Sequence, residues 1–227
     1  MLEIHLPHKS LHGFGEFLLH LFTITVGLLI AVQIESFVEW RHHVHLAEEA
    51  RAALRIEIEH NLKDLKDAQA GLKPWRDQID ADLAAMQRIQ EHPDDPKAQH
   101  PTLNLNASGV TLDDTAWKTA QTTGALAYMP YEEAGRYARI YQSQAMLLAA
   151  EDKPLEDVAG MVGLLHKFHW EKSSKITREQ ASDMAERLGR MDLHLTNGDT
   201  LLEAAVEQAE AFLQNRAART SFTGTLH

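Results

Sequence analysis

The chain of 227 residues begins with an apolar stretch and continues with a longer part in which apolar residues recur at helical spacing. From Phe17 to Ile34 no residue carries a formal charge, apart from His20 when it is protonated. A helix over these residues is about 27 Å long, close to the thickness of about 30 Å of a bilayer's hydrocarbon core. We therefore predict a transmembrane helix over residues 14–40.

Both ends of this stretch carry residues that suit a membrane surface. Phe14 and Phe17 lie at one end, and Trp40 followed by Arg41 lies at the other, where interfacial aromatic and basic side chains collect. A cleaved signal peptide fits less well, because only Lys9 precedes the apolar run and no small-x-small cleavage site follows it. A core helix of a soluble protein is the other alternative to a membrane span.

The polar residues of the stretch gather on one helical face. At 100° per residue, this face contains His20, Thr23, Gly27, Ala31 and Glu35. Three of the five are small and spaced by four, which allows another helix to approach closely. One interpretation is that the face packs against a second transmembrane helix that also satisfies its ionisable groups. The other is that Glu35 reaches to the interface and the glycine is incidental.

After Trp40 the periodicity predicts a long amphipathic helix over residues 41–92. Apolar residues recur at spacings of three and four in a stripe of coiled-coil type. Gly71 and Pro74 interrupt this pattern, so we expect a kink or a break there. The residues of the stripe that we predict to mediate association are Leu54, Ile58, Leu62, Leu65 and Leu72.

The sequence predicts a proline-rich irregular connection over residues 93–110 and a helical bundle over residues 111–219. Within this bundle, Asp113 or Asp114 is the expected N-cap of a helix that Gly124 ends. Pro130 begins the next helix, whose inward residues are expected to be Tyr137, Tyr141, Met146 and Leu147.

Further turn and cap signals divide the rest of the bundle. Pro154 suits the first turn of another helix, and Thr177 with Gln180 predicts a capping box. The segment Leu-Thr-Asn-Gly-Asp-Thr at residues 195–200 predicts a turn before a last helix that ends near residue 218. Residues 1–13 and 220–227 are expected to be short tails.

These elements predict an all-α protein. One N-terminal transmembrane helix continues into a long amphipathic helix, which joins an antiparallel helical bundle.

Composition narrows the possible functions. The chain contains no cysteine, which excludes disulfides, thiol catalysis and zinc sites built on thiolates. Its formal net charge is −11, and no basic stripe is present. A nucleic-acid partner is therefore not expected, because such binding requires clustered Lys and Arg.

Histidine is abundant, so a metal site was considered. Glu57 and His60 form a single Glu-x-x-His motif, whereas a di-iron bundle requires two such motifs and further glutamates. His166 and His169, with Glu171 nearby, are more simply explained as solvated side chains of a surface helix. Phosphate loops, dinucleotide fingerprints and nucleophile elbows are absent. We predict no enzyme, no metal and no cofactor.

Two segments resemble a bacterial family of uncharacterised single-span membrane proteins. The stretch "VGLLIAVQIESFVEWR", preceded by Gly-Glu, is similar to the N-terminal signature of that family. A second segment from Asp113 to Met129 is similar to a later block of the family. The resemblance implies a membrane anchor and a helical architecture without assigning an activity. The matching positions of the signature are Gly15, Glu16, Gly27, Ile30, Ala31, Gln33, Ile34 and Glu39.

The first functional hypothesis is a non-enzymatic single-pass membrane protein that self-associates or serves as an accessory or scaffold subunit of a membrane complex. Its expected partners are membrane lipid and either a second copy or another membrane protein subunit. The alternative is a membrane-anchored sensor or ligand-binding bundle, with an apolar pocket lined by Trp117, Tyr128, Tyr137, Tyr141 and Trp170.

The expected location is a bacterial inner membrane, and two signals disagree on its sidedness. Arg41, Arg51 and Arg55 follow the span, which by the positive-inside rule places the bundle in the cytoplasm. Basic tails in the similar family imply a periplasmic bundle, and this second placement is the one we predict.

Overall fold

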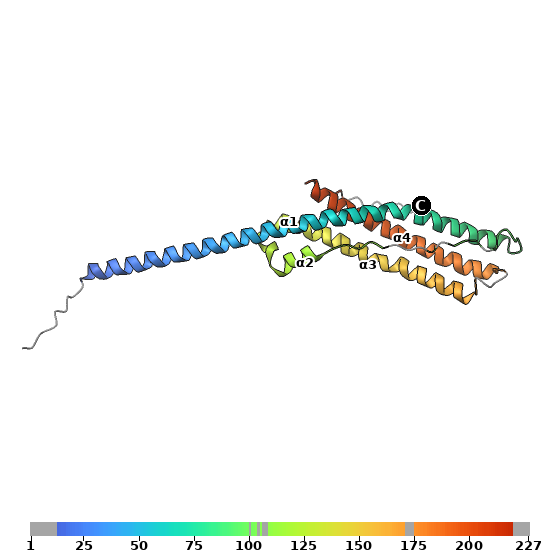
Figure 1. Cartoon of the computed structure of the whole chain (residues 1–227), viewed down its shortest axis with the longest axis horizontal. Helices are drawn as coiled ribbons and strands as arrows, with labels where there is room; N and C mark the ends of the chain where they lie inside the picture. The colour runs from blue at the N-terminus through green and yellow to red at the C-terminus, as the bar shows by residue number, and fades with distance from the viewer. Residues whose placement is uncertain (1–12, 100, 104, 106–108, 171–174, 220–227) are drawn as a thin grey trace, which may run out of the picture. The chain divides into compact units, whose positions relative to one another are not determined.

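The computed structural model describes residues 13–99, 101–103, 105, 109–170 and 175–219, and every regular element in them is helical (Figure 1). The predicted all-α class is confirmed. Most of both predicted tails lies outside the described residues. The elements are α1 Phe14–Glu91, α2 Thr115–Thr122, the 3-10 helix η1 Ala125–Tyr128, α3 Tyr131–Lys167 and α4 Arg178–Leu213. The chain divides into two units, Met1–Glu49 and Ala50–His227, and α1 contributes to both.

The described part of the first unit is the apolar N-terminal portion of α1. This portion is long and apolar enough to cross a membrane, and none of its most apolar 18-residue window is buried inside the chain. That exposure contradicts the alternative of a soluble core helix, which would be mostly covered by other elements.

The second unit is a helical bundle built from residues 50–91 of α1 together with α3 and α4 (Figure 1). Arg51 of α1 contacts Glu133 near the start of α3, while Gln90 near the end of α1 contacts Ala181 near the start of α4. The α1 segment therefore runs antiparallel to α4 and parallel to α3. A parallel pair requires the chain to return along the bundle between α1 and α2, and the described residues between Glu91 and Thr115 lie along that return.

The bundle has a core of aliphatic side chains and methionines supplied by all three long helices. One cluster includes Met86 and Ile89 of α1, Met161 of α3, and Leu188 of α4. A second cluster joins Leu65, Leu147 and Leu202. The returning connection takes part in both, through Leu103 and Leu105 in the first cluster and Val110 and Leu112 in the second. Its apolar residues therefore fix the path of a segment that has no regular secondary structure.

The chain is helical through Gly71 and Pro74, so the predicted break is absent there, and a kink stays a prediction. Three local predictions were wrong. Helix α3 continues through Pro154 instead of beginning a new helix there. Residues 195–200 lie inside α4 and do not form a turn. Met146 is 50% exposed and does not point inward, whereas its neighbour Leu147 is buried.

Packing explains why the turn signal at residues 195–200 fails. Leu195 and Leu202 are buried on either side of it and hold α4 in register with the core. Arg76 of α1 also reaches Asp199 at 3.5 Å and Thr196 at 3.1 Å, so two polar residues of this segment have a cross-helix partner. These tertiary contacts offset the weak helix propensity of Asn and Gly.

The cap predictions were partly right. Thr177 and Gln180 form the predicted capping box, with the Thr177 hydroxyl accepting from the Gln180 N–H at 3.1 Å. Asp114 occupies the N-cap of α2, but its side chain makes no capping hydrogen bond. Gly124 follows α2 with φ of 73°, a left-handed conformation that glycine adopts readily.

Candidate functional site

On the predicted packing face of the apolar helix, two polar side chains contact backbone carbonyls of the same helix. The Thr23 hydroxyl donates to the Leu19 carbonyl at 2.8 Å, and the His20 ring lies 3.3 Å from the Glu16 carbonyl oxygen. At Gly27 a Cβ would meet no atom within 4 Å. Ala31 and Glu35 are exposed within the chain, as are Phe14, Phe17, Trp40 and Arg41 at the two ends. Packing of this face and the interfacial roles stay predictions.

The predicted association stripe lies inside the chain's own bundle. Leu54, Ile58 and Leu65 are fully buried, and Leu62 and Leu72 are partly buried against the second core cluster. These side chains are already covered by helices of the same chain. Their role in contacts with a second protein remains a prediction.

Glu57, considered above as part of a metal motif, instead caps a helix. Its carboxylate accepts from the backbone N–H groups of Ala116 at 2.6 Å and Trp117 at 3.2 Å, in the first turn of α2. It also accepts from the Tyr141 hydroxyl at 2.6 Å, and burial together with this hydrogen bond raises the pKa of Tyr141. A negative side chain at a helix N-terminus is stabilising. The Glu57 carboxylate thus supplies the cap that Asp114 does not make.

Among the described residues, no group of three or more His, Asp or Glu side chains could hold a metal ion. His166 and His169 are exposed near the end of α3, and Glu171 lies outside the described residues. His194 of α4 does lie 2.6 Å from Asp157 of α3, but this is a pair of residues on two helices.

The aromatic residues expected to line a pocket are separated. Trp117 stacks on Tyr141 with ring centroids 5.0 Å apart, and Tyr137 packs against Phe212 at 4.9 Å. Tyr128 is 45% exposed, and Trp170 packs against the first core cluster. The five predicted residues therefore do not form one cavity.

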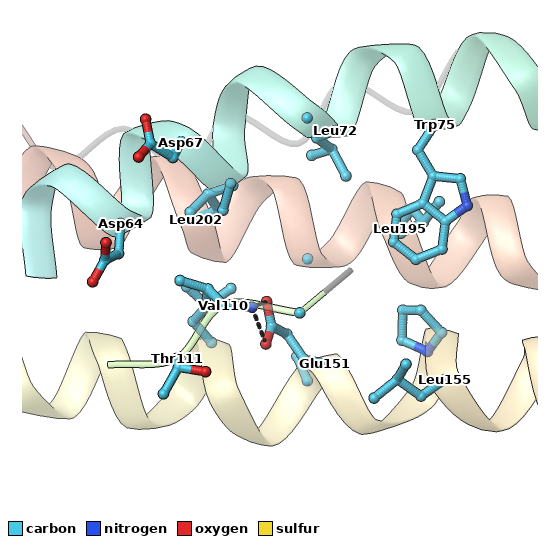
Figure 2. Close-up of a pocket in the computed structure, with 17 residues that line it drawn as sticks. Asp64, Asp67, Leu72, Trp75, Val110, Thr111, Glu151, Leu155, Leu195 and Leu202 are labelled. Carbon is cyan, nitrogen blue, oxygen red and sulfur yellow. Dashed lines mark hydrogen bonds between the residues drawn. The ribbon is translucent and has the colours of Figure 1, made fainter. Parts of the chain in front are cut away.

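A different pocket lies within the second unit, between α1, α3, α4 and the returning connection (Figure 2). Its volume of about 440 Å³ is within the range of small-molecule sites. One side, which we call the apolar end, is formed by Trp75, Leu155 and Leu195. Asp64 and Asp67 of α1 lie away from these residues and form what we call the acidic end (Figure 2).

Glu151 of α3 lies between the two ends and points to the connection (Figure 2). Its two carboxylate oxygens accept from the Val110 N–H at 3.1 and 3.0 Å. Burial raises the pKa of the Glu151 carboxyl, the Val110 hydrogen bond opposes that rise, and the Asp152 carboxylate adds to it. This carboxylate therefore holds the connection in place and presents negative charge to the pocket.

Two helical glycines keep the pocket open. Gly71 of α1 and Gly198 of α4 line it, and a Cβ at either position would meet no atom within 4 Å. Glycine inside a helix costs about 0.5–1 kcal/mol relative to alanine. Since neighbouring atoms would accommodate alanine at both positions, close packing does not account for these glycines.

A buried proline also lines the pocket. In a helix the N–H of residue 154 would donate to the carbonyl of Ala150, but Pro154 has no N–H. Ala150 and Pro154 both line the pocket. The proline thus leaves the Ala150 carbonyl without its helical partner at the pocket wall.

The sequence contained these signals, but each was interpreted as a helix break or bend. Gly71, Pro154 and the Asn-Gly pair at residues 197–198 all lie in continuous helices, and all except Asn197 line the pocket. Helix breakers at positions that remain helical were the signal that could have located the pocket.

Comparisons of the chain with protein-family models, curated proteins and solved structures found no match. The site is therefore interpreted from its own geometry.

Proposed function

We propose that the protein is a membrane-anchored helical bundle that binds a small molecule, without catalysing a reaction on it. The observation that carries this proposal is the pocket in the second unit. It combines an apolar end with acidic side chains, as small-molecule sites do, and two helical glycines leave its volume open. The apolar helix over residues 14–40 would supply the anchor.

Filling the pocket tests this proposal. Gly198→Leu places a side chain into the open volume at a position where a Cβ meets no atom within 4 Å. Gly189→Leu is the matched control, because Gly189 lies in the same helix, is equally open at its Cβ and does not line the pocket.

The full chain in lipid nanodiscs would be screened against small neutral, cationic and anionic fragments by saturation-transfer difference NMR. We expect some fragments to bind the unchanged chain and the Gly189→Leu variant but not the Gly198→Leu variant. If no fragment binds the unchanged chain and loses binding in the Gly198→Leu variant, the proposal is contradicted.

A second candidate function is self-association, or assembly as an accessory subunit, through the transmembrane helix. Its specific support is the face around Gly27, where a Cβ would meet no atom and the Thr23 hydroxyl is already bonded to its own helix. Such a face allows close contact between helices.

Self-association predicts that Gly27→Leu, or Ala31→Leu on the same face, reduces the oligomer size in mild detergent. Thr25→Leu is the control, since residue 25 is about 200° from residue 27 around the helix. Light scattering that gives equal masses for Gly27→Leu and the unchanged chain would exclude this route. A second protein co-purifying in stoichiometric amount would instead support an accessory subunit.

For the location we propose a bacterial inner membrane with the bundle on its periplasmic side, supported by the family resemblance. Because the chain has no cysteine, one introduced cysteine reports sidedness. Leu193→Cys is suitable, because Leu193 is 57% exposed. A membrane-impermeant maleimide should label this variant in intact cells. Labelling only after lysis would place the bundle in the cytoplasm.

A further inference from the structure

We propose that the pocket selects a primary amine with an apolar body. The protonated amine would lie at the acidic end, on the side of Asp64 and Asp67 and facing Glu151, and the apolar body would lie against Trp75, Leu155 and Leu195 (Figure 2). This inference rests on the proposed binding function and names its ligand class.

The charge of the pocket favours a cation. Three of its lining side chains are carboxylates, and no lining residue that the structure describes is Lys, Arg or His. The whole chain carries a formal net charge of −11, which adds a long-range attraction for cations. A carboxylate or phosphate ligand would meet only like charge at this site.

The hydrogen-bonding groups favour a cation that carries N–H donors. Carboxylates are acceptors only, and the Ala150 carbonyl beside Pro154 is a further acceptor without its helical donor. Thr111 is the lining residue that also has a hydroxyl to donate. An ammonium group carries three donors and can serve several acceptors, whereas a quaternary ammonium carries none.

The arrangement of the carboxylates disfavours a metal ion. A metal would require them to converge, and no such group exists among the described residues. Instead, Asp64 and Asp67 come from one helix and Glu151 from another, with Glu151 between the acidic and the apolar end (Figure 2). An elongated organic cation fits this spread of charge, because its head and body can occupy different ends.

Three ligands that differ in the head group test the inference: 3-phenylpropylamine, 3-phenylpropan-1-ol and 3-phenylpropanoate. Their binding to the full chain in phosphatidylcholine nanodiscs would be measured by isothermal titration calorimetry, with empty nanodiscs subtracted. We expect the amine to bind at least about tenfold more tightly than the alcohol, since charge-assisted hydrogen bonds are the stronger ones. The carboxylate should not bind.

Two variants assign the selectivity to the pocket. Glu151→Gln keeps an acceptor for the Val110 N–H but removes the charge, and Asp67→Asn removes a charge from an exposed position. Each should lower the affinity for the amine by a larger factor than the affinity for the alcohol. Glu203→Gln, exposed on α4 and outside the pocket, is the control and should change neither affinity.

The outcomes separate this inference from the proposed function. If the alcohol binds as tightly as the amine and Gly198→Leu abolishes both, the pocket is a ligand site but the amine selectivity is wrong. If the amine still binds to Gly198→Leu with unchanged affinity, or if none of the three ligands binds the unchanged chain, both the inference and the proposed binding site are overturned.

Discussion

Asn61 shows how one buried polar side chain fixes the returning connection at the scale of single residues. This side chain is fully buried, accepts from the Asp113 N–H at 2.9 Å and donates to the Asp113 carbonyl at 2.7 Å. It also donates to the Gln144 side chain of α3 at 3.1 Å. Asn61 therefore joins α1, the connection and α3 in one hydrogen-bonded network.

The first prediction concerns this network. Asn61→Ala removes three hydrogen bonds, two to the Asp113 backbone and one to the buried Gln144 side chain, and each contributes about 0.5–1.5 kcal/mol. We expect the free energy of unfolding to fall by about 2–4 kcal/mol, measured by urea denaturation followed by circular dichroism. Asn197→Ala, at an exposed position of α4, is the control. A loss below about 0.5 kcal/mol for Asn61→Ala would show that the network contributes little.

The second prediction concerns the pH dependence of stability at Glu151. Its pKa is raised in the folded chain, mainly by burial, so folding opposes ionisation of this group. Its favourable contribution is complete below the pKa of the unfolded chain and is lost as the pH rises through the higher folded pKa. Glu151→Gln removes this loss and still accepts from the Val110 N–H.

We therefore expect Glu151→Gln to have a higher Tm than the unchanged chain at neutral pH, with the difference shrinking as the pH falls through the raised folded pKa and vanishing below the unfolded pKa of about 4.3. Thermal unfolding at a series of pH values measures this difference. Glu203→Gln should show no such trend. A Tm difference that is constant with pH would mean that Glu151 does not titrate as described.

At the scale of elements, the sequence predicted helix type well and helix boundaries less well. The periodicity of α1, its end near residue 92 and the Thr177 capping box are local features, and the structure confirms them. Pro154 and Gly198 were interpreted as breaks because their local preference opposes helix. Both are held in helices by buried neighbours such as Leu147, Met161 and Leu202, which are contributions that only the folded bundle supplies.

The candidate site could not be predicted for a related reason. Its residues come from α1, α3, α4 and a connection without periodicity, so no stretch of sequence contains the pattern. Val110 lies beside Glu151 although 41 positions separate them in the sequence, which no local pattern reveals. Of the aromatic residues chosen from the sequence, Trp117 and Tyr141 stack on each other, Tyr137 packs against Phe212, Trp170 packs against the first core cluster and Tyr128 is exposed.

The third prediction compares the effects of replacing Pro74 and Pro154, which both lie inside helices. Pro154→Ala restores an N–H to donate to the Ala150 carbonyl, and Pro74→Ala does the same for the carbonyl of Ala70 in α1. We expect each variant to be about 1–2 kcal/mol more stable, because an interior proline costs about 3 kcal/mol and part of that is recovered through a less flexible unfolded chain. Only Pro154→Ala should weaken binding of 3-phenylpropylamine.

Urea denaturation of both variants checks the gain in stability, and calorimetry checks the loss of amine affinity. Equal amine affinities for the two variants would show that the Ala150 carbonyl plays no part in the pocket. A less stable Pro154→Ala variant would show that packing of the buried proline ring outweighs the missing hydrogen bond.

At the scale of the whole molecule, the two units differ in how far their apolar side chains are buried. The second unit contains two core clusters built from its own residues, with Leu65 and Met86 among the fully buried side chains. Large apolar side chains of the first unit are exposed, including Phe22, Leu28 and Ile34. Exposed apolar area of this extent is characteristic of an interaction with a membrane or another protein.

The last prediction follows from this difference. A chain of residues 41–227 lacks the exposed apolar stretch, retains the whole bundle and has 21 Lys and Arg against 29 Asp and Glu, a formal charge of −8. We expect it to be soluble without detergent, monomeric by light scattering and to unfold in one cooperative thermal transition, because the core and the charge both remain. It should also bind 3-phenylpropylamine with the affinity of the full chain, since every pocket residue is kept. Aggregation of this shorter chain, or unfolding without a cooperative transition, would show that the bundle depends on the N-terminal stretch for its fold.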